Sequence, residues 1–162
     1  MKIIGVFLIN LVAYTLAAQE ITVNATIEKV ERQINKWLLI VTAAEDVILS
    51  TTVQKPITNE ADLAIEYKVV DKSDKVLGEG SGPLCTHPKS KDGLMVHLMG
   101  KFLGINLECP VREKTGDRPL MASVLDIALD EKPEEMVPLC ITLSIKEEGT
   151  TIVTLTLMAI PL

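Results

Sequence analysis

The chain has 162 residues, a length that fits one domain with a sizeable buried core. Hydrophobic residues make up 48% of it but aromatic residues only 3%, so the composition predicts an aliphatic core and excludes a stacking platform for bases or sugars. The formal net charge of −6 argues against a nucleic-acid partner, because neutralising phosphates requires clustered Lys and Arg.

Residues 1–18 have the pattern of a secretory signal peptide. Lys2 precedes an uncharged apolar run that ends in the small residues Thr15, Ala17 and Ala18. This run is shorter than the roughly 20 residues that a membrane-spanning helix needs. We therefore expect cleavage, which leaves residues 19–162 as a single domain that is secreted or delivered to the lysosomal lumen.

The first half of this domain has the alternating pattern of β-strands. Residues 21–28 alternate between apolar and polar side chains, and the polar face carries Asn24 of the N-glycosylation acceptor Asn24-Ala25-Thr26. The β-branched runs 37–42 and 47–53 predict two more strands. Residues 27–36 fit a strand or a helix equally well.

A predicted hairpin follows, and another closes the chain. Residues 62–70 alternate and are followed by turn residues 71–74 and a return strand at Val76. The glycine cluster 78–82 then predicts a loop with unusual backbone angles. Residues 120–129 fit a strand or a helix, whereas 139–145 and 153–159 form a hairpin pattern around the turn 147–150. About seven or eight strands at this spacing predict an all-β antiparallel sandwich.

Residues 90–104 break the strand period and predict one short amphipathic helix. Ser90 or Asp92 provides the N-cap, and Gly104 suits the left-handed C-terminal position. Such a helix ordinarily just covers a core, but methionines also adapt well to irregular apolar ligands. Both interpretations stay open, and the candidate ligand-binding residues are those of the apolar face: Leu94, Met95, Leu98, Met99, Phe102 and Leu103.

The sequence gives little support for catalysis, metal binding or a cofactor. His87 and His97 have no neighbours with metal-ligand spacing, and the glycine cluster matches neither a nucleophile elbow nor a dinucleotide fingerprint. We therefore expect a protein that is not an enzyme. Three cysteines remain in the mature chain, an odd number that predicts one bridge and a leftover thiol or an intermolecular link.

The segment Cys109-Pro110-Val111-Arg112-Glu113-Lys114-Thr115-Gly116 carries a resemblance to a known family. With the glycine-rich stretch, Cys85 and the helix before it, this segment resembles the lipid-recognition (ML) superfamily, and within it the ganglioside activator-like branch. That family has a Cys-Pro-hydrophobic-x-x-Gly signature, and the spacer before Gly116 is longer here.

The resemblance implies an immunoglobulin-like sandwich whose sheets splay apart to hold a lipid. By it, Cys85 and Cys109 pair across the helical loop, and Cys140 matches no cysteine of the family. It implies a secreted protein that holds a glycolipid, phospholipid or sterol for transfer or presentation. A lipid-processing enzyme, a receptor or a membrane surface would then be its partner. The alternative is a secreted interaction or adhesion protein with a filled core. Oligomeric state is left open, since Cys140 can link two chains.

Overall fold

The computed structural model describes residues 19–44, 46–116 and 118–162, so the predicted signal peptide lies outside the described residues. Within these ranges the chain forms nine strands and one helix. In chain order these are β1 Gln19–Arg32, β2 Leu38–Ala43, β3 Val47–Val53, β4 Leu63–Val70, β5 Val76–Pro83, α1 Lys91–Leu103, β6 Lys114–Thr115, β7 Ala122–Leu129, β8 Leu139–Glu147 and β9 Thr150–Pro161.

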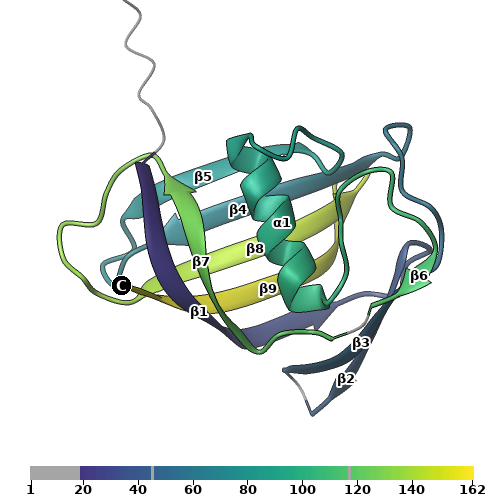
Figure 1. Cartoon of the computed structure of the whole chain (residues 1–162), viewed down its shortest axis with the longest axis horizontal. Helices are drawn as coiled ribbons and strands as arrows, with labels where there is room; N and C mark the ends of the chain where they lie inside the picture. The colour runs from purple at the N-terminus through teal and green to yellow at the C-terminus, as the bar shows by residue number, and fades with distance from the viewer. Residues whose placement is uncertain (1–18, 45, 117) are drawn as a thin grey trace, which may run out of the picture.

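The strands form two antiparallel sheets. The larger has the order β5-β4-β8-β9-β1-β7 and the smaller has the order β2-β3-β6. Figure 1 shows α1 lying across β4, β8 and β9, and α1 also contacts β3 of the smaller sheet. One layer is therefore the six-stranded sheet, and the other combines the smaller sheet with the helix. The predicted all-β sandwich with one short helix is confirmed.

In the β8–β9 hairpin, where the predicted alternation of apolar and polar residues is strongest, the predicted inner face is the buried one. The inner face of the β8–β9 hairpin is at most 1% exposed and comprises Leu139, Ile141, Leu143, Ile145, Val153, Leu155, Leu157 and Ala159. Gly149 takes a left-handed φ of 82° in its turn. Residues 27–32 and 122–129, for which a helix was the alternative, form strands. Residues 27–32 pair with β9, and residues 122–129 pair with β1. These ladders satisfy the backbone hydrogen bonds of both segments, and this favours strands over helices.

The loop predicted for the glycine cluster is wrong, because Gly78–Gly82 belong to strand β5. None of these glycines has a positive φ. Their small size serves packing instead. Gly80 lies opposite Tyr67 of β4, and a Cβ at Gly80 would come within 2.3 Å of the Tyr67 hydroxyl. The glycines leave room on the inner face for this ring and for the start of α1.

We expect Gly80→Ala to lower the free energy of unfolding by about 1–3 kcal/mol, because overpacking forces the buried Tyr67 ring to move. Gly78→Ala is the matched control. Its Cβ would meet Leu129 at 3.5 Å, an ordinary contact. Urea denaturation of both variants measures the difference, and equal midpoints would show that the glycine at residue 80 is not required by packing.

Candidate functional site

The segment between Cys85 and Cys109, called the flap below, is closed by a disulfide between these two residues. Their Cα atoms lie 5.3 Å apart, which confirms the predicted pairing. Helix α1 occupies the middle of the flap. The Ser90 side chain accepts a hydrogen bond from the Gly93 amide at 3.0 Å, and Gly104 ends the helix with φ 75°. Of the two predicted N-caps, the structure therefore selects Ser90.

The polar contacts of two residues, Lys91 and Asp92, together called the latch, hold the first turn of α1 to the six-stranded sheet. The Tyr67 hydroxyl donates a hydrogen bond to Asp92 at 2.8 Å. Lys91 pairs with Asp130 and also donates to the Glu79 carbonyl at 3.2 Å. Burial, together with the Asp92 carboxylate, raises the pKa of Tyr67, so the phenol keeps the proton that it donates.

The Lys91–Asp130 pair lowers the pH at which Asp130 takes up a proton. The hydrogen bond from Lys91 lowers the pKa of Asp130 below its usual value of 3.8. A lowered folded-state pKa contributes stability above the ordinary value, and that stability is lost only as pH falls through the lowered one. The Asp130 carboxylate therefore stays ionised at mildly acidic pH. Asp130 is largely exposed, so solvent screens its contribution.

The predicted ligand-binding residues lie on the inner face of α1, against the large sheet. Leu94 is half-buried, and the other five are at most 2% exposed: Met95, Leu98, Met99, Phe102 and Leu103. These five belong to a continuous hydrophobic core that fills the space between the layers. Ligand contact stays a prediction for all six, and for the five buried residues it requires α1 to move. A charged side chain at Leu98 or Met99 would disrupt the fold itself.

An apolar pocket of about 250 Å³, called the flap pocket below, lies on the flank of α1. Leu84, Leu94, Val96 and Leu107 supply apolar walls. A neighbouring groove of about 540 Å³ continues past the end of the helix and shares four residues with the pocket: His97, Asn106, Leu107 and Glu108. Ligand sites usually measure about 300–1,000 Å³, so the flap pocket alone is too small for a whole lipid.

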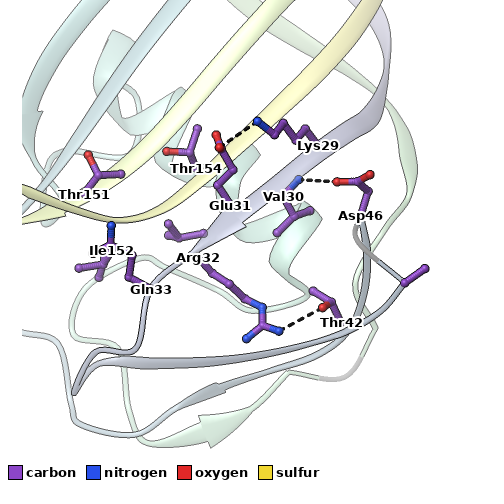
Figure 2. Close-up of a pocket in the computed structure, with 12 residues that line it drawn as sticks. Lys29, Val30, Glu31, Arg32, Gln33, Thr42, Asp46, Thr151, Ile152 and Thr154 are labelled. Carbon is purple, nitrogen blue, oxygen red and sulfur yellow. Dashed lines mark hydrogen bonds and ion pairs between the residues drawn. The ribbon is translucent and has the colours of Figure 1, made fainter.

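A larger groove of about 850 Å³ lies between β1, β9 and the end of the β2–β3 hairpin (Figure 2). Its polar groups bind one another: the Val30 amide donates to Asp46 at 3.1 Å, and Arg32 donates to Thr42 at 3.2 Å. Lys29 pairs with Glu31 at 2.9 Å, and the hydrogen bond from Lys29 to Glu31 raises the pKa of Lys29. The lysine stays protonated and cannot act as a nucleophile or base. Sequence reasoning missed this groove because three distant segments form it.

The described residues offer no cluster for metal binding. No group of three His, Cys, Asp or Glu side chains within the described ranges is placed to hold a metal ion. His87 and His97 are both exposed, and His87 Nδ1 accepts the Lys89 amide at 3.2 Å. The expectation that the protein is not an enzyme stays a prediction.

Asn24 and Cys140 both lie on the outer face of the six-stranded sheet. Asn24 is exposed and sits between Ile160 of β9 and Val124 of β7. Cys140 is a half-buried free thiol opposite Met158. Glycosylation and an intermolecular link through these residues stay predictions.

Comparison with known proteins identifies no relative: no family model matches the chain, and no curated protein is significantly similar to it. The disulfide is compatible with an extracellular or lumenal location. Among the described residues, no helix combines the length and apolarity needed to cross a membrane.

Proposed function

We propose that the protein is a secreted or lumenal lipid-binding protein without enzymatic activity, as its resemblance to the lipid-recognition (ML) superfamily implies. The observation that carries this proposal is the flap. A disulfide-closed segment places a helix with an apolar inner face over a sheet, next to an apolar pocket that its own side chains leave unfilled. The latch holds only the first turn of α1. The last turns can therefore separate from the sheet while the first stays attached.

The cost of moving α1 selects ligands by chain length. Exposing five buried side chains costs on the order of 8–15 kcal/mol, at about 1.5–3 kcal/mol each. An acyl chain of about 16 methylenes recovers about 13 kcal/mol, at about 0.8 kcal/mol per methylene. A long chain balances the cost of opening, and a short chain does not. The polar rim of the flap pocket, with His97, Asn106 and Glu108, suits a headgroup that stays in water.

Native mass spectrometry of delipidated protein tests this function. The ligands are lysophosphatidylcholines with chains of about 8, 12 and 18 carbons, chosen to span the expected threshold. We expect binding at the longest chain and none at the shortest. Leu94→Lys places a charge in the flap pocket and should abolish the complex, whereas Val76→Lys, at an exposed aliphatic position on β5 outside the pocket, should not. The absence of a complex at every chain length would refute the proposal.

A second candidate function is that of an interaction or adhesion protein that acts through its surface. The filled interior favours it, since a core that packs continuously needs no ligand for its stability. A ligand-free mass at every chain length, together with an unchanged melting temperature, would support this alternative over lipid binding.

A further inference from the structure

The β2–β3 hairpin carries large aliphatic side chains on both faces, although Ser50 and Thr52 share its outer face, and this is unusual for a sheet at a protein surface. Its inner face is buried in the core through Leu38, Ile40 and Ile48. Its outer face exposes large aliphatic side chains: Leu39, Val41, Val47 and Leu49. An antiparallel sheet with one solvated face ordinarily places polar residues there. The hairpin therefore presents an apolar surface that no described residue covers.

These side chains form one continuous patch, called the hairpin patch below. Leu39 and Val41 are two residues apart on β2, and their cross-strand partners are Thr52 and Ser50, so the aliphatic contact to β3 comes from Leu49, the neighbour of Ser50. Leu49 is the extra residue of a bulge in β3 and is 56% exposed. The fully exposed Ile34 extends the patch, because it lines the same small pocket as Leu39. Figure 1 shows the hairpin projecting from the body of the molecule beside β1.

We infer that the hairpin patch docks onto the surface of a zwitterionic lipid membrane. This goes beyond the proposed function, because docking on a membrane and uptake of a lipid are measured separately. Three properties of the patch lead to a lipid surface in preference to a protein partner: its size, its composition and its charge.

Size is the first argument. Two strands of six and seven residues present a face of roughly 20 by 10 Å, or about 200 Å². A stable protein interface buries about 800 Å² on each partner, so the patch is too small to hold a second copy by itself. Arg32 of β1 reaches Thr42 near the end of β2 across the groove of Figure 2, so part of the β2 edge is already in contact with β1. A membrane requires no minimum area.

The composition and the charge of the hairpin patch also favour a membrane over a protein partner. The patch consists of Ile, Leu and Val, whereas the residues that dominate protein interfaces are Trp, Tyr and Arg. Within residues 38–53 the only charged residues are Glu45 and Asp46, which in the sequence stand between the two strands. The two strands carry no basic residue, and of the basic residues that flank them Arg32 donates to Thr42 and Lys36 pairs with Glu147. In a chain of net charge −6, the patch therefore has little attraction for anionic lipids. Burial of aliphatic side chains is the remaining driving force, and it does not depend on headgroup charge.

Co-sedimentation with phosphatidylcholine vesicles tests the inference. We expect the protein to bind, and Leu49→Lys and Val41→Lys each to weaken binding by about tenfold or more. The matched control is Val124→Lys, which adds the same charge at a residue 57% exposed on the outer face of the other sheet, and it should bind like the unaltered protein. All three positions are exposed, so circular dichroism should report an unchanged fold.

Several outcomes would overturn the inference: no binding of the unaltered protein to phosphatidylcholine, equal weakening by Val124→Lys, or binding only when phosphatidylserine is added. A dimer in analytical ultracentrifugation that Leu49→Lys dissociates, without vesicle binding, would assign the patch to a second copy. Native mass spectrometry with monomeric lysophosphatidylcholine separates the two proposals. If docking fails but uptake persists, only this inference falls; if uptake fails but docking persists, only the proposed function falls.

Discussion

Phe102→Ala is expected to lower the free energy of unfolding by about 3–5 kcal/mol, because it removes a fully buried aromatic ring and leaves a cavity. Phe102 lies in the last turns of α1, and its ring is 0% exposed. Chemical denaturation measures the loss. Phe102→Leu is the matched control, and since it keeps most of the volume, it should cost less than about 1.5 kcal/mol.

The same variant separates the two candidate functions. If a ligand must displace the inner face of α1, removing the ring lowers the cost of opening, so Phe102→Ala should bind shorter acyl chains than the unaltered protein does. Native mass spectrometry across the chain-length series gives the answer. An interaction protein with a filled core would lose the same stability and gain no ligand. Loss of stability without any shift in the chain-length threshold would therefore argue against the flap as the lipid site.

Removal of the disulfide by the double substitution Cys85→Ser and Cys109→Ser is expected to cost about 3 kcal/mol in the chain-entropy model. The bridge closes a loop with a sequence separation of 24, and its loss frees the unfolded chain. The latch contacts of Tyr67 and Lys91 remain, so the first turn of α1 should stay attached while the rest of the flap loosens. Denaturation midpoints measure the stability, and amide hydrogen exchange along α1 measures the loosening.

Cys140→Ser is the control for the disulfide variant. Cys140 is a free thiol on the outer face of β8, and its replacement should change stability by less than about 0.5 kcal/mol. A comparable loss in both variants would mean that cysteine chemistry in general, and not the closed loop, determines the stability. Uniform hydrogen exchange along α1 in the disulfide variant would contradict the role given to the latch.

Local patterns in the sequence determined most of the elements. Alternation with period two identified the strands 21–28, 62–70, 139–145 and 153–159, because each has one face in the core and one in water. Capping residues and a period near four identified α1 nearly to its ends. These signals act within a few residues, so they can be read without knowledge of the fold. The pairing of Cys85 with Cys109 came from the family resemblance and not from such a pattern.

Tertiary structure decided what these local patterns could not. Gly78, Gly80 and Gly82 read as a loop, yet they lie in a strand, and Tyr67 and the start of α1 occupy the space that side chains at Gly80 and Gly82 would fill. The apolar face of α1 could not reveal whether it met a ligand or a core, since both are apolar. The groove of Figure 2 and the exposure of the hairpin patch depend on which distant segments lie side by side. The sequence specifies which side chains are apolar, but only the packed chain shows which of them are buried.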